Sequence, residues 1–95
     1  ANPFRRVDLV AQLSHKDNPS TAMVLLKERL AKIPNVIAKP APDVEILTFT
    51  PMGPVLALRP YVHNDHYWQV YFDTNKVISE AGFAVPEQHF AVKQA

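Results

Sequence analysis

The chain has 95 residues, of which 47% are hydrophobic and 20% charged, a mixture typical of one small globular domain. Ten Lys and Arg residues balance nine Asp and Glu residues, and no basic stripe of the kind that binds nucleic acid is present. The absence of cysteine excludes disulfides, thiol catalysis and cysteine-based metal sites. No apolar stretch approaches the roughly 18–20 residues of a membrane helix, and Arg5 and Arg6 lead into an alternating segment rather than a signal peptide.

The first third of the chain predicts a strand followed by a helix. Period-two alternation over residues 4–14 is typical of a half-buried strand. Asp17 or Asn18 is suited to cap a helix with Pro19 in its first turn, and the helical spacing of apolar residues extends to about Lys32. The residues expected on the buried face of the strand are Val7, Leu9, Ala11 and Leu13.

The middle of the chain predicts a β-hairpin. Residues 43–50 alternate, residues 51–54 have the composition of a turn, and residues 55–62 form a second, more apolar strand. Pro60 has no amide hydrogen to donate, so we expect it on an edge strand or at the end of its own strand.

The last third predicts a second helix. Asn64 or Asp65 is expected to cap it, and Gly82 is expected to end it after Ala81 with a left-handed backbone conformation. Residues 83–85 and 89–92 are expected to be extended. The order β-α-β-β-α-β predicts an α+β domain with the ferredoxin-like split βαβ topology, in which a small antiparallel sheet carries two helices on one face.

The histidines are the first residues to consider as metal ligands. His63 and His66 are spaced H-x-x-H at the start of the second helix, whereas His15 and His89 are distant in sequence. A zinc site needs three or four converging ligands held by hydrogen-bonded neighbours. Two histidines on either side of a helix start need not face the same way, so we expect exposed loop histidines and no metal site.

Motifs for catalysis are missing from the sequence. Ser14, Ser20 and Ser79 lack a G-x-S-x-G turn, and the two glycines, Gly53 and Gly82, cannot form a glycine-rich phosphate loop. We therefore expect a protein that is not an enzyme and has no cofactor.

Aromatic residues on the predicted sheet raise the question of RNA binding. Tyr61 and Phe49 could stack on bases with Arg59 nearby, but no Lys or Arg patch surrounds them. We therefore expect both rings to pack in the core and no nucleic-acid partner. Arg59 is expected to pair with a carboxylate or to bond loop carbonyls.

The second helix is more apolar than one small sheet can cover. Trp68 and Phe72 lie one turn apart and extend the apolar arc beyond the main inward stripe. Either loops fold over these two rings or a partner subunit covers them, and the sequence leaves both alternatives open. The inward stripe comprises Tyr67, Tyr71, Thr74, Ile78 and Ala81, with Val70 and Val77 at its margin.

The segment 59–70, with its Tyr67-Trp68 pair, and the later Ala81-Gly82…Pro86 ending resemble the carboxy-terminal cytoplasmic domain of the small-conductance mechanosensitive channel (MscS) family. Members of that family have a strand that ends in Arg and an aromatic residue, a polar loop, and a helix that opens with Tyr-Trp and ends in Ala-Gly, an apolar pair and Pro. The upstream strand, helix and hairpin match in order and spacing. Glu87 and Gln88 depart from the pattern, since the family commonly has an aromatic residue and a second Pro there.

The resemblance implies a vestibule domain below a channel pore. Residues 1–87 would form the α/β domain, and residues 88–95 would form a C-terminal strand or tail that pairs with its copies in a small barrel. The domain would join a heptamer that filters solutes and supports gating in the cytoplasm beneath the inner (plasma) membrane. We expect the polypeptide to continue upstream into a glycine- and alanine-rich membrane helix.

The resemblance also implies roles for particular residues. The candidate contacts between subunits are Trp68, Phe72, His89, Phe90 and Val92, and the candidate structural residues are Arg59, Tyr67, Gly82 and Pro86. The alternative function is a freestanding regulatory domain of ferredoxin-like topology that binds a small molecule, although the sequence shows no pocket for one.

Overall fold

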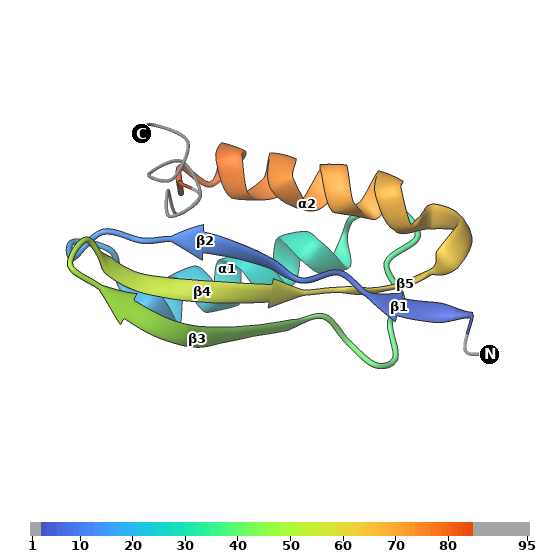
Figure 1. Cartoon of the computed structure of the whole chain (residues 1–95), viewed down its shortest axis with the longest axis horizontal. Coiled ribbons are helices and arrows are strands. Elements are labelled where there is room, and N and C mark those ends of the chain that lie inside the picture. The colour runs from blue at the N-terminus through green and yellow to red at the C-terminus, as the bar shows by residue number, and fades with distance from the viewer. Residues whose placement is uncertain (1–2, 85–95) are drawn as a thin grey trace, which may run out of the picture.

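The structure is a computed structural model that describes residues 3–84. Within these residues, five strands, two α-helices and one 3₁₀ turn follow one another (Figure 1). They are β1 Phe4–Arg6, β2 Leu9–Gln12, α1 Pro19–Ala31, β3 Asp43–Thr50, β4 Gly53–Arg59, β5 Tyr61–His63, η1 Asn64–His66 and α2 Tyr67–Glu80.

The strands form two antiparallel sheets. One contains β1 and β5, and the other has the strand order β2-β4-β3. With both helices packed against these strands, the domain has the predicted mixed α+β class. The expected segment 89–92 lies outside the described residues. At the free edge of β2, an isolated antiparallel bridge joins Gln12 to Ala84, and the Gln12 amide donates to the Ala84 carbonyl at 2.6 Å.

Two of the predicted strands are each divided in two. The strand expected over residues 4–14 is β1 and β2, separated at Val7 and Asp8, and that expected over residues 55–62 is β4 and β5, separated at Pro60. The two breaks lie opposite each other, because the Val7 amide donates to the Pro60 carbonyl at 2.9 Å. Pro60 lies directly after the end of β4, and its missing amide ends the ladder there.

The first helix begins as its sequence predicts. Asn18 is the N-cap, and its side-chain oxygen accepts a hydrogen bond from the Thr21 amide at 3.1 Å. Asp17, the other candidate, instead accepts a bond from the Ser14 amide at 2.8 Å and so closes the preceding turn. The strand Asp43–Thr50 also has its predicted bounds.

The second helix begins later than predicted. Asn64 and Asp65 lie in the 3₁₀ turn η1, and α2 starts at Tyr67 without a side-chain cap. The capping bond belongs to His63, whose Nδ1 accepts from the Asp65 amide at 3.1 Å. Gly82 has φ +87°, which confirms the predicted left-handed residue after the helix.

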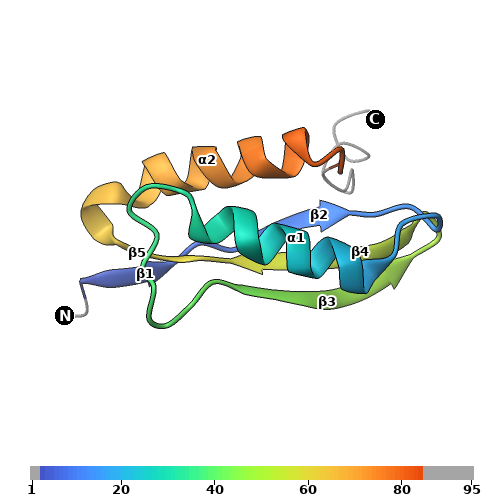
Figure 2. The same ribbon diagram turned by 180° about the vertical axis from the view of Figure 1, so that it is seen from behind.

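The core lies between the helices and one face of the strands. Leu56 and Leu58 of β4 pack in one cluster with α1 and α2 residues, and Figure 2 shows α1 lying over the strands from that side. The four strand residues predicted to face inward do so, although Leu9 is only half-buried. The helix residues that complete the core are Ala22, Leu26, Leu30, Val70 and Ile78.

On the face of the sheet opposite Leu56 and Leu58, a buried glutamine side chain forms hydrogen bonds between β2 and the β3–β4 turn. The Gln12 amide nitrogen donates to the carbonyls of Leu13, Gly53 and Pro54 at 2.8–3.2 Å, and its oxygen accepts from the Thr50 hydroxyl at 3.1 Å. This side chain is 6% exposed and fully hydrogen-bonded, so it ties β2 to the β3–β4 turn at little desolvation cost.

The two glycines provide a matched pair of substitutions. Both have positive φ, but a Cβ at Gly53 would lie 2.6 Å from the Leu13 carbonyl oxygen, whereas a Cβ at Gly82 meets nothing within 4 Å. We expect Gly82→Ala to lower the free energy of unfolding by about 1 kcal/mol through backbone strain alone. Gly53→Ala should cost about 3 kcal/mol or more, because backbone must also move. Urea denaturation of both variants measures the difference, and equal losses would contradict it.

Candidate interaction surface

The flank of α2 that faces away from α1 exposes large aromatic side chains. Trp68 is 60% exposed and Phe72 62%, so no loop within residues 3–84 folds over them. The inward stripe is confirmed in outline, since Thr74 and Ile78 are buried and Tyr67 and Tyr71 are half-buried. Val70, predicted at the margin, is completely buried. The first of the two alternatives for Trp68 and Phe72 is therefore not realised in the described chain.

These aromatic residues form one continuous cluster. The Trp68 ring lies 5.2 Å from that of Tyr71 and 5.9 Å from that of Phe72, measured between centroids. Tyr67 packs edge-on against Trp68 at 5.1 Å, and the Arg5 guanidinium lies 3.8 Å above the Tyr67 ring. We call Tyr67, Trp68, Tyr71 and Phe72 the α2 patch. Rings that hold one another in place lose little side-chain entropy when a partner covers them.

A second exposed apolar cluster lies on the edge strand β3 and its turn. Ile46 is 42% exposed, Leu47 51%, Phe49 69% and Met52 63%. We call these four residues the β3 patch. The prediction that Phe49 packs in the core is wrong, and Tyr61 is only half-buried. The pairing of β3 with β4 shifts register between Ile46 and Thr48, which places Ile46 and Phe49 opposite Leu56 and Pro54 on the same face of the sheet. Their exposure shows that the helices do not cover this edge of that face.

The sequence contains a signal for this patch that our prediction did not use. Val44 and Ile46 have one parity along the strand, whereas Leu47 and Phe49 have the other. A regular strand with helices on one face cannot bury both sets, so this change of parity indicates either exposed residues or the register shift that the structure has between Ile46 and Thr48. The exposed aromatic ring also lies at the far end of β3 from Arg59, which is paired in register with Asp43, so the two do not form a base-stacking site.

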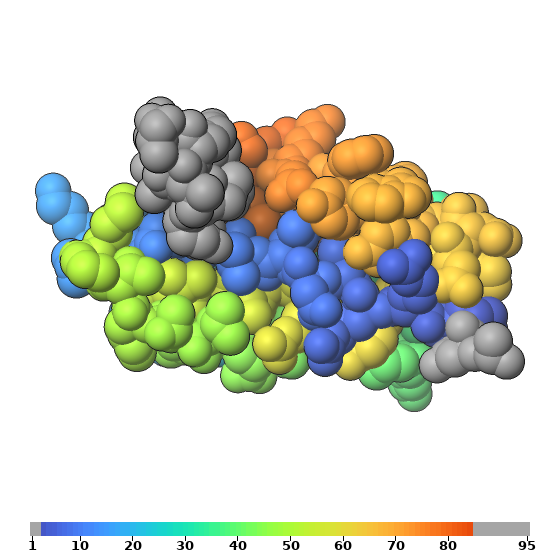
Figure 3. All heavy atoms as spheres, in the orientation of Figure 1, coloured from blue at the N-terminus to red at the C-terminus, as the bar shows by residue number. Residues whose placement is uncertain are grey.

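The two patches lie on opposite sides of the molecule. Helix α2 runs along the upper side and β3 along the lower side in both ribbon views. The space-filling view shows the same arrangement, with α2 atoms in orange above and β3 atoms in green below (Figure 3).

Arg59 has the carboxylate partner that the sequence predicts. Its Nε lies 3.7 Å from the Asp8 carboxylate, which also accepts a shorter contact of 2.8 Å from Arg6. The hydrogen bond to Asp8 is the main cause that raises the pKa of Arg6 above its ordinary value. These groups are partly exposed, so the pairs position the β1–β2 and β4–β5 breaks rather than adding much stability.

The described histidines contact groups of the chain other than a shared metal-ligand cluster. His15 Nε2 lies 2.6 Å from the Pro51 carbonyl oxygen, and His63 Nδ1 lies 3.5 Å from the Asp65 carboxylate. The rings of His63 and His66 are 6.5 Å apart and tilted. Within residues 3–84, no group of three or more His, Cys, Asp or Glu residues is placed to hold a metal ion.

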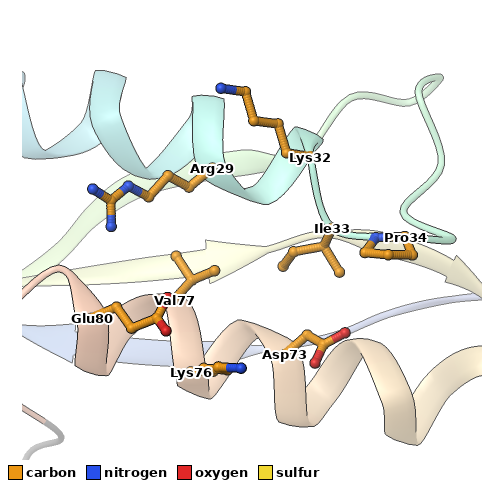
Figure 4. A pocket seen from close by; sticks show the side chains of 8 residues that line it. All are labelled: Arg29, Lys32, Ile33, Pro34, Asp73, Lys76, Val77 and Glu80. Carbon is orange, nitrogen blue, oxygen red and sulfur yellow. The ribbon is translucent and has the colours of Figure 1, made fainter.

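An open groove of about 430 Å³ separates the two helices at their solvent side (Figure 4). Its lining residues are Arg29, Lys32, Ile33, Pro34, Asp73, Lys76, Val77 and Glu80. Five of these are charged and the groove is wide open to solvent, whereas small-molecule sites enclose most of their ligand in a mainly apolar pocket. The groove therefore gives little support to the regulatory-domain alternative.

The remaining candidate residues, Pro86, His89, Phe90 and Val92, lie outside the described residues. No family model matches the sequence, and no curated protein is significantly similar to it. Among the described helices, none has the length and hydrophobicity to cross a membrane.

The single tryptophan lies in the α2 patch and reports its exposure. Because Trp68 is 60% exposed, we expect acrylamide to quench its fluorescence readily at low protein concentration. Quenching should weaken as the concentration rises if copies cover the patch. Val24→Ser, a substitution at a 69% exposed residue on α1, is the matched control and should change neither result. A tryptophan protected from acrylamide even at high dilution would contradict the described exposure.

Proposed function

We propose that this chain is the non-catalytic cytoplasmic vestibule domain of a mechanosensitive channel of the MscS family. In this role it forms part of a cage that filters solutes below the pore and supports oligomerisation and gating. The observation that carries the proposal is the exposed pair Trp68 and Phe72. This pair lies in the first half of α2, and Trp68 belongs to the Tyr67-Trp68 motif on which the family resemblance partly rests.

The physical argument is that a domain in a ring needs surfaces for its neighbours rather than a catalytic pocket. Trp and Tyr are enriched at the centres of protein interfaces because they bury a large area at a low entropy cost. A four-ring cluster in which Trp68 and Phe72 are mainly exposed and Tyr67 and Tyr71 half-buried is costly to leave in water. A second copy of the chain is the partner that the resemblance supplies, and the copy number of a heptamer rests on the resemblance alone.

The proposal also adds a fourth strand to the three-stranded sheet. The bridge between Gln12 and Ala84 starts an antiparallel pairing at the free edge of β2. A strand that continued this pairing would give the order 4-1-3-2 of the ferredoxin-like fold, counted over the predicted β-α-β-β-α-β elements. The tail, residues 88–95, would then extend from this edge toward its copies at the cage floor.

Assembly in solution tests the interface. We expect the light-scattering mass of the 95-residue chain to rise with concentration toward that of a ring. The double variant Trp68→Ser/Phe72→Ser should remain monomeric and lose less than about 1 kcal/mol of unfolding free energy, since both rings are mainly exposed. Val24→Ser, which removes an exposed apolar side chain elsewhere, should assemble like the unmodified chain. Assembly that survives the double variant would remove Trp68 and Phe72 from the interface.

Cell fractionation tests the assignment to a channel. An antibody raised against this chain should detect, in cells that produce the protein, a polypeptide in the inner-membrane fraction that is much larger than 10.7 kDa. Proteolysis of inverted membrane vesicles should remove the epitope, whereas proteolysis of sealed right-side-out vesicles should not. A polypeptide of 10.7 kDa in the soluble fraction would overturn the proposed function.

A further inference from the structure

Two of the three histidines in the described chain make ring contacts that respond differently to a proton. Histidine is the side chain that ordinarily gains or loses its charge between pH 5 and 8. His15 Nε2 lies 2.6 Å from the Pro51 carbonyl oxygen, which can only accept a hydrogen bond, so this nitrogen carries a hydrogen in both protonation states. Protonation of His15 therefore leaves its bond intact.

His63 is bonded in the opposite sense. Its Nδ1 accepts a hydrogen bond from the Asp65 amide at 3.1 Å, and a backbone amide nitrogen can only donate. The bond therefore requires an Nδ1 without a hydrogen, which places the ring hydrogen of neutral His63 on Nε2. A further proton must bind to Nδ1, because that is the free nitrogen, and it removes the acceptor of this bond.

Asp65 also offers a partner to the protonated ring. Its carboxylate oxygen Oδ2 lies 3.5 Å from the same Nδ1, just beyond hydrogen-bond length. A hydrogen on Nδ1 repels the amide hydrogen and attracts this oxygen, so an approach of less than about 1 Å forms a charge-assisted bond. The turn η1 thus has two arrangements, one with the Asp65 amide on Nδ1 and the other with the Asp65 carboxylate there.

The groups nearest to His63 leave the choice to these two arrangements. On η1 the His66 ring lies 6.5 Å away, and on β1 the uncharged Phe4 ring meets His63 edge-on at 5.8 Å, measured between centroids. Arg6 and Tyr61 form the next pair of β1 and β5 on the same face of the small sheet. Among the described residues, no second carboxylate lies within 4 Å of the His63 ring nitrogens.

The remaining neighbours of β5 lie on its other sides. Arg5 belongs to the opposite face of the small sheet, where its guanidinium stacks on Tyr67 at the start of α2. The α1–β3 loop pairs along the other edge of β5 through two uncharged residues, Val36 and Ile37.

We propose that His63 is a proton-operated cap of the turn that leads into α2. When neutral it holds η1 by accepting from the Asp65 amide, and when protonated it releases that amide and binds the Asp65 carboxylate. α2 has no side-chain cap of its own, and η1 continues directly into Tyr67 and Trp68. Acid therefore loosens the turn that positions the first rings of the α2 patch. The device uses contacts within one copy only, so it is independent of the proposed function.

Nuclear magnetic resonance of the ¹⁵N-labelled 95-residue chain tests the cap. At pH 8 the ring nitrogen shifts of His63 should show a hydrogen on Nε2 and none on Nδ1. Protection of the Asp65 amide from hydrogen exchange, corrected for the intrinsic rate at each pH, should fall roughly fivefold between pH 8 and pH 5, as expected for the loss of one cap. The fall should have the same midpoint as the titration of the His63 ring signals.

Three variants separate the cap from other effects of acid. His63→Asn keeps a side-chain oxygen that can accept from the Asp65 amide but gains no proton, so protection should be the same at pH 8 and pH 5. His63→Ala has no acceptor and should show the low protection at both pH values. His66→Asn is the matched control, because it removes the neighbouring histidine and should leave the fall in protection unchanged.

Several results would overturn the proposal. A hydrogen on Nδ1 of His63 at pH 8 would do so in the unmodified chain, without recourse to any variant. Equal protection of the Asp65 amide at pH 8 and pH 5, or a fall that persists in His63→Asn, would do so as well. A fall that disappears in His66→Asn would assign the response to His66 instead. Assembly and membrane fractionation test the proposed function separately, so neither failure implies the other.

Discussion

Burial of the central strand along nearly its whole length is the constraint on which the other contacts depend. β4 is buried from Gly53 to Leu58, with β2 and β3 as its neighbours and both helices on a single face. Two helices of 13 and 14 residues cover the middle of this sheet and leave its margins open. The far margin of β3 and the outer flank of α2 therefore carry six of the eight exposed large hydrophobic residues of the described chain, the others being Phe4 and Val24. Both patches follow from the narrowness of the helical layer.

Local signals predicted the elements whose ends depend on single residues. The Asn18 side chain caps α1, and Gly82 adopts the left-handed conformation expected after α2. The strand β3 has the expected bounds. The divided strands were not predictable in this way, because the break at Val7 arises from its pairing with Pro60, more than fifty residues away in the chain. Periodicity reports which residues share a face, but it does not report which strand lies at an edge.

The difference between local periodicity and strand order also explains which features of the candidate interaction surface could be predicted. The apolar arc of α2 is wide enough in the sequence to predict that Trp68 and Phe72 exceed the available cover. Phe49 was misplaced because its burial depends on the position of β3 at the edge of the sheet, which only the strand order reveals. The contact of Arg5 with Tyr67 needs β1 to pair with β5, so it also lay beyond local pattern analysis.

The break at Val7 and Pro60 has a geometric consequence for the two exposed apolar surfaces. β5 leads directly into η1 and the start of α2, so the α2 patch is anchored to the small sheet, while the β3 patch belongs to the three-stranded sheet. The junction at Pro60 therefore joins the strand that leads into the exposed rings of α2 to the strand that supports the exposed edge of β3. The relative position of these two surfaces is determined where a proline interrupts a strand.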